Sequence, residues 1–142
     1  MEYLNSNIMQ KKFISFLKRQ NHDFYYENVF LFEKESDILS VKDWVIYEYE
    51  FKVGKADFRK DIKKNRHNEN RKPHYFYYVL SSEDIINGQY LSYAGIYVHK
   101  FTKDGFNKFV LVKEPEIIRD WDITDSEMYL LLKKTCDAKK ND

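Results

Sequence analysis

Apolar side chains recur along the chain with two different periods, one typical of helices and one typical of strands. Residues 7–20 carry apolar side chains every three or four positions, which predicts an amphipathic helix capped in the asparagine-containing turn before it. Residues 55–70 predict a second helix, which is mostly polar. Thr124-x-x-Glu127 has the form of a capping box and predicts the start of a last helix.

Segments rich in aromatic and β-branched residues predict the strands. They lie at 25–33, 37–42, 44–53, 74–80 and 90–99, with a further short strand or hairpin at 106–113. The predicted order is α-β-β-β-α-β-β-α, which is a mixed α/β fold. Because the 142 residues contain no repeats, low-complexity tracts or linkers, we expect a single domain over residues 1–142.

The stretch at 44–53 is the most informative of these strands. Its odd positions, from Val45 to Val53, are all apolar, whereas its even positions end in Glu48, Glu50 and Lys52. Successive side chains of a strand point to opposite faces. One face is therefore expected to enter the core, and the other to present two carboxylates and an ammonium at the end of the strand.

Composition excludes several classes of protein. Apolar residues make up 43% of the chain and aromatic residues 18%, which is not a disordered composition. Cys136 is the only cysteine, so neither an intrachain disulfide nor a cysteine-based zinc site can form. No apolar run reaches the length of a membrane span, and the N-terminus lacks the apolar segment of a signal peptide. We expect a soluble, intracellular (cytoplasmic) protein without a membrane partner.

Charge is unevenly distributed, although the whole chain carries only +1. Residues 52–72 contain nine Lys or Arg against three acids, a net +6, which leaves −5 for the remainder. A local basic block in a near-neutral protein points to an anionic partner. A solvated face with Lys/Asp pairs explains only some of these cations, so contact with phosphates is favoured. In the helix predicted at 55–70 the cations recur every three or four residues: Lys55, Arg59, Lys63 and Arg66.

Three charged residues suggest a catalytic site. Asp37 begins one predicted strand, and Glu50 and Lys52 end the next, so a hairpin of the two strands would bring Asp37 close to Glu50. Two carboxylates suit Mg²⁺, which prefers hard oxygen ligands and usually retains water. Such a metal would lower the pKa of a bound water and offset charge on a scissile phosphate, and Lys52 would orient the water or stabilise negative charge.

Each of these features also has a simpler explanation. Asp37 could cap a turn, because aspartate is common there, and the charged end of the strand could be a solvated face. The acid-x-Lys pattern is itself weak, since it also occurs at Asp61 and Asp137. The joint occurrence of a strand end, an acidic partner and a following basic helix favours the metal site.

Ser36-Asp37 and Glu50-Phe51-Lys52 together resemble the signature of the PD-(D/E)XK nuclease superfamily. Serine stands where that signature usually has proline, while the aspartate is kept. The run EFKVGKADFRKDIKKNRH at 50–67 looks like the strand-to-helix segment of small phage and bacterial members. The strands HYFYYVL and YAGIYV also match their layout, so the resemblance covers about residues 7–112, with element ends uncertain by a few residues.

The resemblance implies a restriction-endonuclease-like α/β fold with a central mixed β-sheet flanked by helices. It also implies a Mg²⁺- or Mn²⁺-dependent deoxyribonuclease that hydrolyses phosphodiester bonds. Asp37 and Glu50 would bind the metal, and the Phe51 backbone carbonyl would complete the shell. Lys52 would then activate the attacking water.

Further expectations accompany this resemblance. An upstream glutamate often joins such metal sites, and Glu27 is the best placed, with Glu33 and Glu35 as alternatives. DNA is the expected partner, held through its backbone by the basic helix, and a homodimer or a protein partner would supply specificity. The alternative is a catalytically inactive module on the same fold that binds nucleic acid or protein. His67 and His74 are not expected to be metal ligands.

Overall fold

The computed structural model describes residues 5–32, 34–62, 67, 70–86, 91–105 and 107–140, and the side chains of residues 62, 107 and 136–140 lie outside this description. The order of elements follows the predicted one, and the short strand or hairpin expected at 106–113 is present as a strand. Along the chain they are α1 (Ser6–Arg19), β1 (Phe24–Val29), β2 (Ser36–Lys42), β3 (Val45–Lys52), α2 (Lys55–Ile62), β4 (Tyr75–Leu80), the short 3-10 helix η1 (Glu83–Ile85), β5 (Gly95–Phe101), β6 (Asn107–Lys113) and α3 (Asp125–Lys140).

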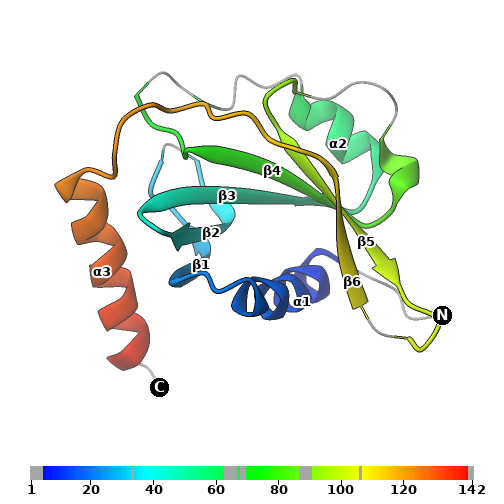
Figure 1. Ribbon diagram of the computed structural model, residues 1–142, viewed down its shortest axis with the longest axis horizontal. Helices are drawn as coiled ribbons and strands as arrows, with labels where there is room; N and C mark the ends of the chain where they lie inside the picture. The colour runs from blue at the N-terminus through cyan, green and yellow to red at the C-terminus, as the bar shows by residue number, and fades with distance from the viewer. Residues whose placement is uncertain are drawn as a thin grey trace.

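The six strands of the described residues form one mixed sheet in the order β1-β2-β3-β4-β5-β6 (Figure 1). The first three strands are an antiparallel meander, and β5 and β6 are also antiparallel. In the middle of the sheet β3, β4 and β5 run parallel, and the chain crosses from β3 to β4 through α2. The carboxyl ends of β3 and β4 therefore lie at the same edge of the sheet, beside the start of α2.

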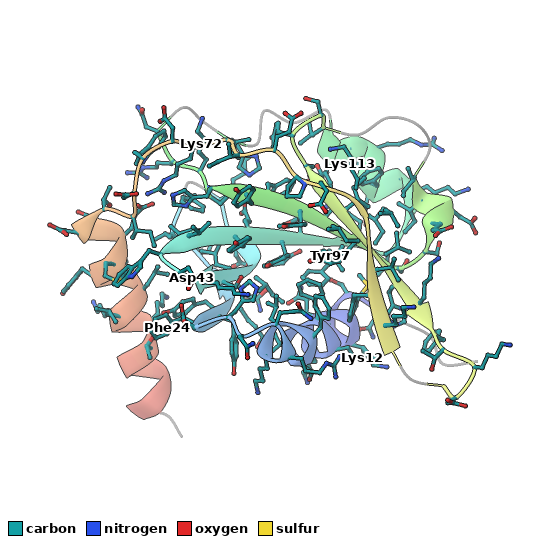
Figure 2. All side chains as sticks on the ribbon, viewed as in Figure 1. Lys12, Phe24, Asp43, Lys72, Tyr97 and Lys113 are labelled. Atoms are coloured by element: carbon teal, nitrogen blue, oxygen red, sulfur yellow. The ribbon has the colours of Figure 1, made fainter. Side chains whose placement is uncertain are left out.

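Aromatic side chains pack one face of the sheet against α1. Met9, Phe13 and Leu17 of α1 are buried against the odd-numbered residues of β3 and β4. Figure 2 shows side chains filling the space between this helix and the sheet. Burial raises the pKa of Tyr49 well above its usual value, so the phenol stays neutral. Tyrosines of three adjacent strands stack with ring centroids 5.1 to 5.4 Å apart: Tyr47 on Tyr75, Tyr49 on Tyr77, and Tyr77 on Tyr97.

The opposite face of the sheet carries α2 and α3. Phe58 of α2 is fully buried among apolar residues of β4 and β5. Leu131 of α3 packs against Leu39 of β2 and Ile46 of β3. Both share a face of the sheet with Glu48, since Leu39 pairs with Glu48 and Ile46 lies two residues before it. In Figure 1, α1 lies below the sheet, α2 above it, and α3 beside the end of the sheet formed by β1 and β2. The even-numbered side chains of β3 thus lie between two helices.

The start of α3 is held by a buried ion pair. The Arg119 guanidinium donates to Glu127 Oε1 at 2.6 Å and to Glu127 Oε2 at 2.7 Å. Glu127 also accepts the backbone N–H of Thr124, and its own N–H bonds to the Thr124 hydroxyl, so the predicted capping box is formed. Burial opposes the charge of Glu127, but the hydrogen bonds from Arg119 and Thr124 outweigh it and lower the pKa of this carboxyl.

Several element ends differ from the predicted ones. The strand predicted at 25–33 ends at Val29, because Val29 pairs with Ser36 and closes the hairpin of β1 and β2. The helix predicted at 55–70 ends at Ile62 as far as it is described, and His67 is not helical.

The strand predicted at 90–99 begins only at Gly95, after a turn in which the Ala94 N–H bonds to the Leu91 carbonyl. A side chain at Gly95 would collide with the Tyr77 ring, since a Cβ there would lie 2.6 Å from a ring carbon. In the part of the chain that is described, no helix is both long enough and apolar enough to cross a membrane.

Candidate active site

Asp37 and Glu50 lie beside each other on β2 and β3. Ile38 pairs with Tyr49 in antiparallel register, so the residue before Ile38 lies opposite the residue after Tyr49. The backbone N–H of Phe51 donates a 2.9 Å hydrogen bond to Asp37 Oδ2, which holds this carboxylate at the end of β3. The hairpin expected from the sequence is formed, and it holds the Asp37 carboxylate at Phe51, the residue that follows Glu50.

Lys52 extends from the same face of β3 as Glu50. Its ammonium nitrogen lies 3.5 Å from Glu50 Oε1 and 3.5 Å from Asp61 Oδ1. Only 14% of the Lys52 side chain and 12% of the Glu50 side chain are exposed to solvent. These charges are largely removed from water, so solvent does little to screen the repulsion between the Glu50 and Asp61 carboxylates. The positive charge of Lys52 between them offsets part of that repulsion.

Asp61 of α2 is a member of this cluster that sequence reasoning missed. Its side chain is 1% exposed, and the Tyr78 hydroxyl of β4 donates a 2.7 Å hydrogen bond to its Oδ2. Phe58, one turn earlier on α2, packs its ring edge against Tyr78 and directs this side of the helix toward the sheet. The spacing of Phe58 and Asp61 was the available signal, since residues three apart share a helix face.

A second polar cluster lies next along the same face of β3. Glu48 is buried and accepts hydrogen bonds from the Ser36 hydroxyl and from His67 Nε2, the latter at 2.8 Å. His67 Nδ1 lies 2.7 Å from the Tyr93 hydroxyl. Both ring nitrogens of His67 therefore have partners within the protein, and the histidine links the chain after α2 to the middle of the sheet.

The basic helix presents its cations on the side away from the sheet. Lys55 and Arg59 are exposed on α2, while Phe58 and Asp61 between and beyond them are buried. Lys63 and Arg66, the other two residues expected to contact DNA, lie outside the described residues. Lys55 and Arg59 are therefore on the same helix as Asp61, which belongs to the acidic cluster.

Glu27 does not join this site, which corrects the expectation that it supports the metal. It pairs with Ile38, which in turn pairs with Tyr49, and cross-strand partners share a face of the sheet. Glu27 is therefore on the α1 face, while Glu50 points to the other. Of the alternatives, Glu35 is exposed in the loop before β2, and Glu33 lies outside the described residues.

The ligands that the site offers to a metal are oxygen atoms from few side chains. Among the described residues, no group of three or more His, Cys, Asp or Glu side chains is arranged to hold a metal ion. The donors would be the carboxylates of Asp37 and Glu50 and the carbonyl of Phe51, which follows Glu50 on β3. Two carboxylates plus water is a donor set that Mg²⁺ commonly accepts.

Comparison with known proteins adds the fold and nothing on chemistry. No protein-family model and no curated protein matches the chain. A solved structure, the SPO1766 protein of unknown function from Silicibacter pomeroyi, is similar with a TM-score of 0.64 and 12% sequence identity. The match covers 92% of this chain and 85% of that one. At this identity the likeness shows a shared α/β fold alone.

Proposed function

We propose that the chain is a Mg²⁺- or Mn²⁺-dependent deoxyribonuclease of the PD-(D/E)XK type. The hydrogen bond from the Phe51 N–H to Asp37, next to Glu50 and its ion pair with Lys52, supports this proposal. The site lies at the carboxyl end of β3 beside the start of α2, and the exposed cations of that helix suit a polyanionic substrate.

The order of elements supports the restriction-endonuclease-like part of the proposal. A helix precedes an antiparallel three-stranded meander, and a second helix then leads to a strand parallel to the third. This is the α-β-β-β-α-β order that the resemblance implies for the catalytic core. In that arrangement the acid of β2 and the acid-x-Lys element of β3 meet at one end of the hairpin.

The residues fit a hard divalent cation by the chemistry of their donors. When bound, Mg²⁺ would lower the pKa of a coordinated water and offset the charge of the scissile phosphate. Asp37 and Glu50 would hold the ion, because the Phe51 N–H keeps the Asp37 carboxylate at the residue that follows Glu50.

Lys52 would act on the phosphate and the attacking water. Its ammonium group can donate a hydrogen bond to the oxygen of the attacking water, which orients the water. It can also donate to a non-bridging phosphate oxygen, whose negative charge increases in the transition state. The water oxygen bonds to phosphorus, the bond to the leaving oxygen breaks, and the leaving oxygen takes up a proton. Lys55 and Arg59 would hold neighbouring phosphates without reading the bases.

The test is cleavage of single- and double-stranded DNA in Mg²⁺ or Mn²⁺ by the wild type and by Glu50→Gln and Lys52→Ala. We expect the wild type to cleave and both variants to lose at least about a hundred-fold in rate, as for removal of a group that stabilises transition-state charge. The controls are Lys103→Ala and Asp104→Asn, whose side chains are exposed in the turn between β5 and β6.

Equal cleavage by all five proteins would place the activity elsewhere or in a contaminant. Salt-sensitive DNA binding without cleavage, unaffected by a chelator, would instead identify the inactive nucleic-acid-binding module. Both outcomes contradict the proposed nuclease.

A further inference from the structure

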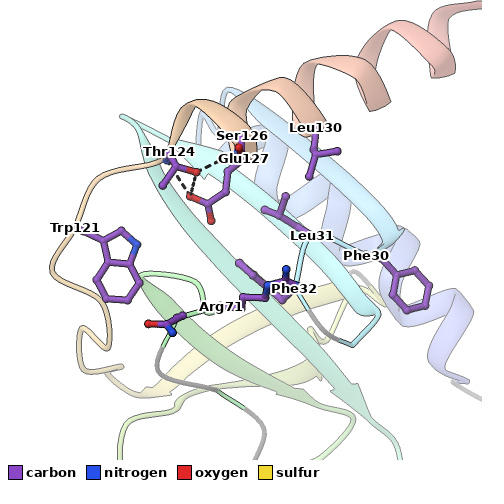
Figure 3. Close-up of a pocket in the computed structure, with 10 residues that line it drawn as sticks. Phe30, Leu31, Phe32, Arg71, Trp121, Thr124, Ser126, Glu127 and Leu130 are labelled. Carbon is purple, nitrogen blue, oxygen red and sulfur yellow. Dashed lines mark hydrogen bonds between the residues drawn. The ribbon is translucent and has the colours of Figure 1, made fainter.

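A pocket of about 380 Å³ opens on the same face of the sheet as the acidic cluster, beside the start of α3. Figure 3 shows Trp121 on one side of it and Phe30 on the other, with Thr124 and Glu127 above. The volume is within the range of small-molecule sites. The pocket is independent of the acidic cluster, since none of Asp37, Glu50 and Lys52 lines it.

The lining combines flat aromatic side chains with groups that can form hydrogen bonds. Phe30, Phe32 and Trp121 contribute rings, whereas Asn70 and Arg71 contribute an amide and a guanidinium. Phe30 is 62% exposed, so its ring is accessible to a ligand at the rim of the pocket. A nucleobase of a DNA strand matches this combination, because it is planar, has hydrogen-bonding groups at its edge and is attached to a phosphate backbone.

Trp121 is fixed before any ligand binds. Its backbone carbonyl accepts hydrogen bonds from His74 Nε2 at 2.9 Å and from Arg119 Nε at 3.0 Å. The Lys72 ammonium lies 5.7 Å and the Arg119 guanidinium 5.1 Å from the centroid of its ring. The indole wall of the pocket is therefore preorganised, which reduces the entropic cost of binding a ring against it.

The pocket lies near the start of β3, and the acidic cluster lies at the end of that strand. Leu31 and Phe32 of the lining pack against the cluster that contains Ile46, which lies four residues before Glu50 on the same face of β3. Four residues of a strand span about 13 Å, or roughly four nucleotides stacked at 3.4 Å each. Arg71 lines the pocket and Lys72 lies over the Trp121 ring, so a phosphate attached to a bound base would meet positive charge there.

We propose that this pocket binds an unpaired nucleobase of a DNA strand whose scissile phosphate lies at Asp37 and Glu50, an assignment that rests on the proposed function for its choice of ligand. A base inside a duplex cannot enter the pocket without leaving the stack. The pocket therefore favours single-stranded or locally unpaired substrates.

The test uses Trp121 as the reporter in chelator, so that no cleavage occurs. Since the chain has two tryptophans, Trp44→Phe leaves Trp121 as the only indole. Pentathymidylate should change the Trp121 emission saturably, whereas an abasic strand of the same length and a blunt duplex should not. Phe30→Ala in this background should weaken binding at least about five-fold, in line with loss of one base-stacking contact. Phe101→Ala, a 51% exposed phenylalanine on β5, is the matched control and should bind unchanged.

Two results would contradict the proposal that the pocket binds a nucleobase. One is a flat Trp121 titration with pentathymidylate, and the other is equal binding of the base-bearing and the abasic strand. Failure of the proposed function is seen separately: saturable binding in the pocket with no cleavage in Mg²⁺ or Mn²⁺ rejects the nuclease and keeps the pocket. Cleavage with a flat titration keeps the nuclease and rejects the pocket.

Discussion

At the scale of single residues, Lys52 is held between two carboxylates of the acidic cluster. It lies 3.5 Å from one carboxylate on its own strand and 3.5 Å from another on α2. The Tyr78 hydroxyl in turn holds the second carboxylate, that of Asp61, from the far side. The direction of the lysine ammonium therefore depends on a helix and a strand outside the β2–β3 hairpin, and Asp61 is a positioning residue for it.

We predict that Asp61→Asn lowers kcat by about ten- to hundred-fold, because small displacements of a positioned group cost on that order. The asparagine oxygen can still accept the Tyr78 hydrogen bond, so KM and the far-UV circular dichroism should change little. Asp57→Asn, an exposed acid on the same helix, is the matched control and should retain wild-type kcat. A kcat for Asp61→Asn equal to that of the control would show that Glu50 alone orients Lys52.

His22 provides a prediction on pH. Its pKa is lowered to about 4 by burial and by Lys42, and its Nδ1 is buried without a hydrogen-bond partner among the described residues. Below pH 6.5 the unfolded chain takes up a proton there and the folded chain does not, so the fold loses stability as pH falls toward 4.

The variant His22→Gln should therefore lose less unfolding free energy between pH 7 and pH 4.5 than the wild type, measured by urea denaturation at both values. Part of the remaining loss of unfolding free energy comes from His74, whose pKa is also lowered by burial and by Arg119. An identical loss in wild type and variant would exclude a neutral buried His22.

At the scale of elements, α3 is attached to the sheet by few interactions. Leu131 is its one fully buried side chain among those described, and Tyr26 of β1 bonds to Thr135 near its end. The paired hydrogen bonds of Arg119 to Glu127 fix its start, and the same guanidinium also donates to the carbonyls of Lys72 and Asp122. This arginine thus connects α3 to the segment before β4.

We predict that Arg119→Met lowers the unfolding free energy by about 3 kcal/mol, because it leaves the Glu127 carboxylate partly buried without its partner. Urea denaturation monitored by circular dichroism measures this loss. Arg19→Met on the exposed side of α1 is the control and should change the free energy by less than about 0.5 kcal/mol. A loss below about 1 kcal/mol for Arg119→Met would show that apolar packing holds α3 without the ion pair.

The elements were more predictable from sequence than the partners of individual side chains. The apolar odd positions at 45–53 and the charged even positions from Glu48 predicted both faces of β3, and assuming a hairpin placed Asp37 near Glu50. Asp61 could not be assigned in the same way, because its role depends on the rotation of α2 set by Phe58 against Tyr78. Glu27 was misplaced because the face of an edge strand depends on register, and a shift by one residue reverses every side chain.

At the scale of the whole molecule, the sheet separates two layers of different character. The α1 layer is aromatic and tightly packed, whereas the other layer holds the acidic cluster, the exposed cations of α2 and the pocket beside α3. All residues assigned to DNA contact among those described lie on this second layer. Binding should therefore depend on cations of α2 and not on those of α1.

We predict that DNA binding in chelator weakens with increasing NaCl and that Lys55→Ala and Arg59→Ala each reduce the salt slope by about one, the value for loss of one phosphate contact. Fluorescence anisotropy with a labelled duplex over a series of NaCl concentrations measures the slope. Lys11→Ala, an exposed lysine on α1, is the control and should leave it unchanged. An equal effect of all three substitutions would indicate general attraction with no defined binding face.

The separation into two layers also affects how the amino-acid sequence of such a protein can change during evolution. Since the sheet backbone lies between them, substitutions on opposite faces share no partners, and their effects on stability should add. The aromatic layer can accept compensating exchanges of similar volume without disturbing the acids. Chains of this architecture can therefore keep their shape at very low identity, so inheritance of activity has to be judged from a few positions on one face.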